Sequence, residues 1–227
     1  MDPLPAHPYY PQSETLPGFV PIQRHWTELV ATFSLIVTAV GLTAAVVAPL
    51  LRPRITRGDR LTFVWCSVSA FIQLTLEIYY LFTYDTLAGR SSLIAELHKE
   101  YSKADSRYIF QDSSVIINEV LTVCVGAPLL LANLYCLVVQ SPHRHPIQIV
   151  VSVGHIYGSL MYLGTNFIDQ WKYTVPHPFY QYAYFYLLST PWLVFPALLI
   201  YQSWKALCPP AAVIRPCVGS PGKEKPQ

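Results

Sequence analysis

Two carboxylates inside long uncharged stretches are the side chains of this sequence best suited to chemistry. Glu77 is the only charged residue in the stretch 61–84, and Glu119 is the only one in the stretch 113–140. A charged side chain at bilayer depth costs roughly 2.5 to 3.5 kcal/mol on insertion scales, so such a residue indicates a functional site. Two of them on neighbouring spans predict proton chemistry. The alternative interpretation is a protonated carboxyl that only hydrogen-bonds a neighbouring helix.

Polar and aromatic side chains accompany the acids at helical spacing. Residues three or four apart share one face of an α-helix, and three such faces carry groups that would contact a ligand. Besides the acids, these groups are Gln73, Asn118, Thr122, Ser189 and Trp192. If the three faces converge, they enclose a cavity with carboxyl, amide, hydroxyl and indole groups. Taken alone, Trp192 is typical of helix packing or of an interfacial aromatic residue.

The composition places these residues in a membrane. Of the 227 residues, 52% are hydrophobic and only 12% are charged, with a mean hydropathy of +0.33. An ordinary soluble domain has roughly 25% charged residues, so this chain has too few solvated groups to coat a water-soluble globule. A net charge of +2 is too small to indicate nucleic acid as a partner.

No cofactor and no metal are predicted. The five cysteines show neither a CxxC nor a His/Cys spacing that would hold zinc, and there is no Gly-rich phosphate loop. Cys66, Cys124 and Cys136 lie in apolar stretches and are expected in the core. His155 lies alone in an uncharged stretch, which by itself is typical of a hydrogen-bonded core residue.

Five uncharged runs are long enough to cross the bilayer, since about 20 residues span its hydrocarbon. They lie at about 28–51, 61–84, 115–140, 147–168 and 178–204. We therefore predict an all-α membrane protein, a bundle of five transmembrane helices over residues 27–205 with an intramembrane cavity. The six prolines in residues 1–26 predict an extended arm lying on the surface, and residues 206–227 form a tail.

The segment 85–114 is the long polar connection. Apolar and charged residues alternate at helical spacing over 93–100, which predicts a short amphipathic helix at the membrane surface that would lid the cavity. Asp105, Arg107 and Tyr108 follow, just before the third span. They are expected to form a salt-bridged cap that positions Glu119, or to contact a ligand at the mouth of the pocket.

Lysine and arginine placement predicts the orientation, because cytosolic loops are enriched in both. Nine of the 15 lysines and arginines lie in the first connection, the third connection and the tail, and the other six lie on the opposite side of the membrane. The N-terminus is therefore expected in the lumen and the C-terminus in the cytosol. Lys225 and Lys223 are the third and fifth residues from the end, the spacing of a dilysine signal, which favours the endoplasmic reticulum membrane. So short a pattern also arises by chance.

Several segments, taken together, match the pattern of a known family. They are His7-Pro8-Tyr9, Phe19-Val20-Pro21, the run 99–108, the two acid-bearing stretches, Val151-Ser152-Val153-Gly154 with Ile156-Tyr157-Gly158, and Trp192-Leu193-Val194 before Pro196. In this order and spacing, over roughly residues 7 to 205, they resemble the emopamil-binding protein family, the sterol Δ8-Δ7 isomerases. The resemblance implies a five-helix fold and a double-bond shift without a cofactor. An acid protonates the alkene, a carbocation forms, and a base removes a neighbouring proton.

The resemblance also implies roles for particular residues. The family presents a histidine and a glutamate one turn apart, a glutamate with a threonine, and an asparagine with a tryptophan. Four of those positions are filled here by Glu77, Glu119, Thr122 and Trp192. The family histidine is Gln73 here and the family asparagine is Ser189. His155 falls where the sterol enzymes have a glutamine, so we hypothesise that His155 hydrogen-bonds Gln73 or Glu77 and restores a titratable group.

Three functions follow from this pattern. The first is a sterol isomerase with a rearranged acid–base set, in which Glu77, Glu119 and His155 are catalytic. The second is an isomerase or cyclase acting on another polycyclic or terpenoid lipid. The third is a non-catalytic protein that binds sterols or amphiphilic amines. All three have a lipid partner within the membrane, and the sequence leaves a homodimer open.

Overall fold

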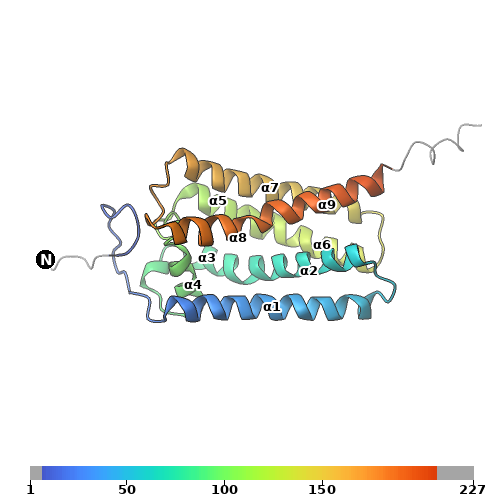
Figure 1. Cartoon of the computed structure of the whole chain (residues 1–227), viewed down its shortest axis with the longest axis horizontal. Helices are drawn as coiled ribbons and strands as arrows, with labels where there is room; N and C mark the ends of the chain where they lie inside the picture. Colours follow the sequence, from blue (N-terminus) through green and yellow to red (C-terminus); the bar gives the residue numbers. More distant parts are fainter. Residues whose placement is uncertain (1–6, 209–227) are drawn as a thin grey trace, which may run out of the picture.

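Five long helices form the molecule. The computed structural model describes residues 7–208, and this part of the chain consists of helices and connections without a strand. The spans are Trp26–Leu51, Arg57–Thr83, Ser113–Val138, Arg144–Ile168 and Phe179–Leu207, each long and apolar enough to cross a membrane. They run along a common long axis (Figure 1). The predicted all-α fold with five spans is confirmed, and the chain is a multi-pass membrane protein.

Three of the spans are built from several helical segments. The first span is α1 (Trp26–Leu51) and the fourth is α7 (Arg144–Ile168). The second joins α2 (Arg57–Ile72), η1 (Gln73–Glu77) and α3 (Ile78–Thr83), and the third joins α5 (Ser113–Leu121), η3 (Thr122–Gly126) and α6 (Ala127–Val138). The fifth joins η4 (Tyr180–Tyr186), α8 (Leu187–Ser189) and α9 (Pro191–Leu207). The connection after α3 contains η2 (Leu87–Gly89) and α4 (Leu93–Tyr101).

The segments η1, η3 and η4 are π-helical turns, in which hydrogen bonds skip one more residue than in an α-helix. Such turns are rare in proteins, and those that occur are often found at functional sites. The turn η1 begins at Gln73 and ends at Glu77, so two candidate residues define its limits. At the start of η3 the Thr122 hydroxyl donates to the Asn118 carbonyl at 2.8 Å, a side-chain bond to the preceding turn of the kind that often bends a helix.

The second and third spans occupy the centre of the bundle. They contact each other through η1 and η3, while α2 packs on α1 and α7 packs along α9. Cys66 and Cys136 are buried as expected, but Cys124 is exposed on the third span. The expectation was wrong for Cys124 because that face of the span is directed away from its neighbours, and a thiol is apolar enough to face lipid.

The N-terminal arm, residues 7–25, lies on the surface with about half of its residues exposed, and a few buried side chains anchor it to the bundle. Tyr9 is completely buried, and Leu16 and Phe19 pack with it against the second span and α4. The buried ammonium of Lys99 donates to the Val20 carbonyl at 2.8 Å. Prolines remove backbone donors and favour extended chain, but they did not reveal that this arm carries core aromatics. The end of the bundle that the arm covers is called the arm end below.

The predicted amphipathic helix exists as α4 (Leu93–Tyr101). Its charged side is not solvated, however, because Glu96, Lys99 and Glu100 are all buried. The Glu96 carboxylate accepts hydrogen bonds from the backbone N–H of Gln23 at 3.1 Å and from the Arg24 side chain at 3.0 Å. The arm thus supplies partners that a helix lying on a lipid surface would take from water.

A charged cluster closes the opposite end of the bundle. The buried Asp59 carboxylate accepts from Arg52 at 2.9 Å and from Arg144 of α7. Gln202 of α9 joins the cluster, since its amide nitrogen donates to the Asp59 carboxylate at 3.4 Å and its amide oxygen accepts from Gln148 at 2.9 Å. This cluster ties the first connection to α7 and α9. The tail lysines of the predicted dilysine signal lie outside the described residues.

We predict that Asp59→Ala destabilises the protein strongly. The substitution leaves Arg52 and Arg144 without their carboxylate, and removing one partner of a buried ion pair typically costs about 3 to 5 kcal/mol. Thermal unfolding in detergent should show a clearly lower midpoint. The matched control is Asp169→Ala, which removes a pair with Lys172 at 3.9 Å in which both side chains are exposed. Equal midpoints for the two variants would contradict the role of the cluster.

Candidate active site

Glu77 and Glu119 lie at the same depth in the bundle. Glu77 is six residues before Thr83, and Glu119 is six residues after Ser113, and both span ends lie at the arm end. At 1.5 Å per residue, each acid is about 9 Å from that end. The segments α3 and α5 contact each other, and the charges of the two carboxyls are close enough to interact. The structure therefore brings the two predicted acids together.

Tyr108 holds one of the acids. Its hydroxyl donates to Oε1 of Glu119 at 2.6 Å, and Glu119 is only 5% exposed. The other carboxylate oxygen of Glu119 and Oε2 of Glu77 are buried without a hydrogen-bond partner among the described residues. Buried polar atoms are nearly always paired in folded proteins. Two orphaned carboxyl oxygens at one depth mark a place where a proton or a ligand would bind.

The electrostatics of Tyr108 report on both acids. Burial first, and then the Glu119 carboxylate, raises the pKa of Tyr108 well above its ordinary value, and Glu77 contributes in the same direction. The phenol therefore keeps its proton and remains a hydrogen-bond donor. Both carboxyls therefore lie close enough to the Tyr108 hydroxyl to raise its pKa.

Tyr108 stands in a cluster of tyrosines that the sequence did not reveal. The ring centres of Tyr80 and Tyr101 lie 5.0 and 5.5 Å from that of Tyr108. The hydroxyls of Tyr101 and Tyr162 are 2.9 Å apart and hydrogen-bonded, and the Tyr80 hydroxyl donates to the Tyr108 carbonyl at 3.1 Å. Burial also raises the pKa of Tyr101. The 16 tyrosines of the sequence are the only signal for this cluster, and their spacing does not show which of them meet.

A second group of residues lies deeper. Nε2 of His155 is 3.1 Å from the side-chain nitrogen of Gln73, and its ring stands edge-on to Trp192 at 5.2 Å. The predicted hydrogen bond between His155 and Gln73 is confirmed. Gln73 is four residues from Glu77, so the turn η1 joins this group to the acid pair. Trp65, at 5.1 Å from Trp192, packs behind it.

Two glycines allow close approach at the site. A Cβ added to Gly126 would lie 3.3 Å from the Gln73 amide oxygen, and one added to Gly158 would lie 2.9 Å from the Asn118 amide oxygen. The amides of Gln73 and Asn118 therefore sit against the backbones of η3 and α7. Asn118 faces α7, as a residue of an interior face should. Ser189 is buried in α8, without a side-chain hydrogen bond among the described residues.

Arg107 is fully engaged by protein groups. Its guanidinium pairs with Asp105 at 2.6 Å, donates to the Thr165 hydroxyl at 2.6 Å and to the Tyr162 carbonyl at 3.0 Å, and is only 1% exposed. Of the two roles expected for this segment, the geometry favours the salt-bridged cap. The cap fixes Tyr108, its neighbour in sequence, against Glu119.

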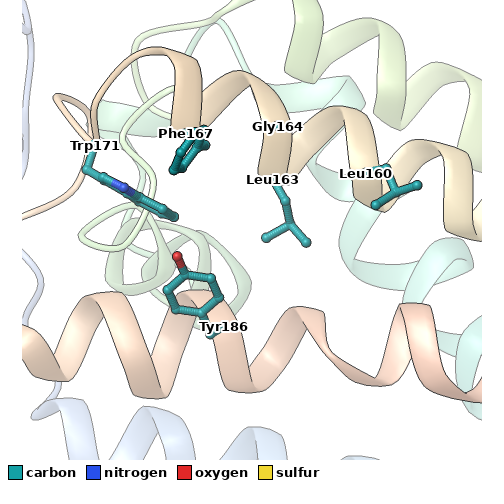
Figure 2. Close-up of a pocket in the computed structure, with 6 residues that line it drawn as sticks. All are labelled: Leu160, Leu163, Gly164, Phe167, Trp171 and Tyr186. Atoms are coloured by element: carbon teal, nitrogen blue, oxygen red, sulfur yellow. The ribbon is translucent and has the colours of Figure 1, made fainter.

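Two hollows of the protein are lined by residues other than the acid pair. One of about 440 Å³ is lined by Trp26, His177, Phe179 and Tyr180. Another of about 300 Å³ lies between α7 and η4 and is lined by Leu160, Leu163, Gly164, Phe167, Trp171 and Tyr186 (Figure 2). A cavity enclosed between the carboxyls stays a prediction.

The fold and the site together define a class. This is a polytopic membrane protein that buries a pair of carboxyls and a histidine–glutamine pair between its spans. A family model described as EXPERA (EXPanded EBP superfamily) matches residues 93–203. The rat 3-beta-hydroxysteroid-Delta(8),Delta(7)-isomerase is 34% identical over 206 residues, which is 90% of each chain. The chain belongs to the emopamil-binding protein family.

Plant relatives widen the comparison. A probable 3-beta-hydroxysteroid-Delta(8),Delta(7)-isomerase of Arabidopsis thaliana is 30% identical over 221 residues, 97% of each chain. The isomeliandiol synthase of Ailanthus altissima is 33% identical over 152 residues, 66% of this chain and 72% of its own. The resemblance read from the sequence motifs is thus confirmed along nearly the whole chain.

We predict that Tyr108 and Glu119 are energetically coupled. A hydrogen bond to a charged group contributes about 1.5 to 3 kcal/mol, and the loss falls on whichever partner remains buried. Thermal unfolding of Tyr108→Phe, Glu119→Gln and the double variant should give a double variant less destabilised than the sum of the single ones. Tyr157→Phe, an exposed position on α7, serves as the control. Additive effects would show that the bond contributes nothing.

Proposed function

We propose that this protein is a membrane-embedded isomerase that shifts a ring double bond of a sterol from Δ8 to Δ7 without a cofactor. The observation that carries the proposal is the meeting of Glu77 and Glu119 at one depth, with a hydroxyl donor on one acid only. A 34% identical relative over 90% of the chain is named for this reaction. The catalytic residues we propose are Glu77, Glu119 and His155.

The hydrogen bond from Tyr108 supports different tasks for the two acids. Glu119 accepts a hydrogen bond from Tyr108, which favours its ionised form. Two adjacent carboxylates in a water-poor site do not both ionise readily, so Glu77 holds the proton that the pair shares. Glu77 is then the general acid and Glu119 the base. Tyr108 is thus the group outside the pair that distinguishes the two acids.

The reaction balances within the pair. Glu77 adds its proton to C9, the C8–C9 double bond is lost, and a tertiary cation forms at C8. The Glu119 carboxylate offsets that charge in a site of low dielectric and removes a proton from C7, which leaves the double bond between C7 and C8. The proton taken up by Glu119 then exchanges with solvent, and the pair returns to the starting state with one proton on Glu77 and a charge on Glu119.

The deeper group would complete the site. His155, bonded to Gln73, supplies an imidazole in place of the family histidine, and Trp192 offers an indole to the cation. We assign Gln73, Asn118, Thr122, Ser189 and Trp192 to substrate binding together with Tyr108, and Arg107 to the support of Tyr108. The imidazole and the indole are in contact, so a change in one is expected to be felt by the other.

A second function is favoured by the two departures from the family pattern. Gln73 cannot act as an acid or a base near neutral pH, and the shorter Ser189 replaces an asparagine. An isomerase or cyclase of another polycyclic lipid is therefore the alternative, and the relative in Ailanthus altissima is named isomeliandiol synthase. A non-catalytic protein that binds amphiphilic amines would retain the acids as well, since cations would pair with them.

Location and orientation are also proposals. We infer an endoplasmic reticulum membrane with the arm end in the lumen and the C-terminus in the cytosol. Among the described residues, Lys99 and Arg107 of the arm side and Arg144 of the opposite side are buried. The opposite side therefore keeps its excess of basic residues, which supports the predicted orientation.

We predict one deuterium at C9 when membranes containing the protein convert a Δ8 sterol to a Δ7 sterol in heavy water. The label follows from delivery of a solvent-exchanged proton by Glu77. Glu77→Gln should lower turnover by at least roughly 100-fold, the size expected for loss of a general acid. Glu28→Gln, an exposed acid on α1, is the control. Binding of the sterol without any product would favour the non-catalytic alternative, and conversion of a different polycyclic lipid would favour the second function.

Exchanging Gln73 and His155 tests the rearranged pair. His155→Gln should lower kcat by roughly 100-fold or more, since it removes the imidazole. The double variant Gln73→His with His155→Gln should recover part of that loss, because it puts the imidazole at the other end of the same 3.1 Å contact. His143→Gln, in the loop before α7, is the control. Full activity of His155→Gln would show that the exchange has no catalytic meaning.

A further inference from the structure

A groove lies between α7 and η4, and exposed apolar side chains form its rim. It is the hollow of about 300 Å³ lined by Leu160, Leu163, Gly164, Phe167, Trp171 and Tyr186, and it is called the α7–η4 groove here. Leu160 and Phe167 are 56% and 70% exposed on a membrane-spanning helix. The groove arises because α7 packs closely along α9 but diverges from the last span toward the arm end (Figure 1).

The groove has one polar end and one apolar end. Trp171 follows α7 at the arm end, and the Tyr186 hydroxyl points into the space below Trp171 and Phe167 (Figure 2). Neither the indole N–H nor that hydroxyl makes a hydrogen bond among the described residues, so both are free for a ligand. From Phe167 to Leu160 the wall is apolar over about 10 Å of helix. These features fit a lipid with a single hydroxyl at the interface and an apolar body along the helix, which is the chemistry of a sterol.

An unbroken series of aromatic contacts connects the groove to the acid pair. The Trp171 ring contacts Phe185 at 5.0 Å, and Phe185, which is completely buried, stacks on Tyr162 at 5.1 Å. The Tyr162 ring centre lies 6.3 Å from that of Tyr108, whose hydroxyl bonds Glu119. Along this series, Phe185 and Tyr162 lie between the Trp171 ring and the Tyr108 ring. Leu163, five residues from the end of α7, lies at about the depth of Glu119.

We propose that the α7–η4 groove is the lateral entrance through which a sterol passes from the bilayer to the acid pair, with Phe185 and Tyr162 as its gate. The proposal rests on the proposed function for the identity of the lipid. The π-helical turn η4 forms one wall, and its wider turn carries Tyr186 and Phe185 on adjacent positions, one facing the groove and one facing the core. A small rotation of η4 would therefore move the rim and the gate together.

Two glycines of α7 provide a matched test. A Cβ added to Gly164, in the groove, or to Gly154, outside it, meets nothing within 4 Å, so both Gly→Leu variants should fold. An obstructed entrance slows binding and release alike and leaves the equilibrium unchanged. In lipid nanodiscs, stopped-flow energy transfer from tryptophan to a fluorescent sterol should show both rates about tenfold slower in Gly164→Leu. The dissociation constant should stay close to that of the unsubstituted protein, and Gly164→Ala should give a smaller effect.

The outcomes separate the entrance from the reaction. Rates in Gly164→Leu equal to those in Gly154→Leu would overturn the entrance. A photoreactive sterol should label the groove residues and be displaced by excess unlabelled sterol. Labelling concentrated instead at Trp26, His177, Phe179 and Tyr180 would assign the entrance to the other hollow and overturn the proposal. Neither measurement needs turnover, so a sterol that enters by the groove but is not converted leaves the entrance standing and removes the isomerase function.

Discussion

The structure depends on burying two carboxyls between its spans while the described residues offer a hydroxyl donor to Glu119 alone. Hydrocarbon cannot solvate Glu77 or Glu119, so the protein has to supply the partners itself, and it supplies a single phenol to Glu119. The residues around Tyr108 hold that phenol in place. Arg107 and Asp105 fix the chain next to Tyr108, and the tyrosine cluster excludes water from it. The asymmetry between otherwise equal acids thus comes from a segment outside the spans, which explains why the connection after α3 is so well packed.

Much of the fold could be predicted from hydropathy, because a bilayer imposes both length and composition on each span. The five predicted runs match the observed spans to within a few residues. The alternation of apolar and charged residues correctly predicted the helix α4, but it did not predict that the charged side of this helix is buried. Amphipathic spacing shows that one side is polar, and it does not show whether water or another segment satisfies that side. Here the arm covers it, and Tyr9 and Phe19 are core residues that a count of prolines cannot reveal.

The candidate site was predictable where the signal is an isolated polar group among apolar neighbours. Glu77, Glu119 and His155 stand out for that reason, and the contact between His155 and Gln73 followed from comparing family positions. Tyr80, Tyr101 and Tyr162 carry no such signal, because a tyrosine is ordinary near a membrane interface. Their meeting depends on the relative rotation and depth of separate helices and of α4. A sequence pattern predicts which face of each helix is polar, but it does not predict the angle at which two helices pack.

The π-helical turns have a consequence for how such a protein diversifies. Each π-helical turn holds one residue more than an α-helical turn. Loss or gain of a single residue there would rotate the rest of the helix by about 100° about its axis, and the surface that faces lipid would stay apolar. At η1 that change would re-aim Gln73 relative to Glu77 without altering either side chain. Descendants of this architecture therefore have a route to new ring systems through changes in chain length, with the proton-handling pair left untouched.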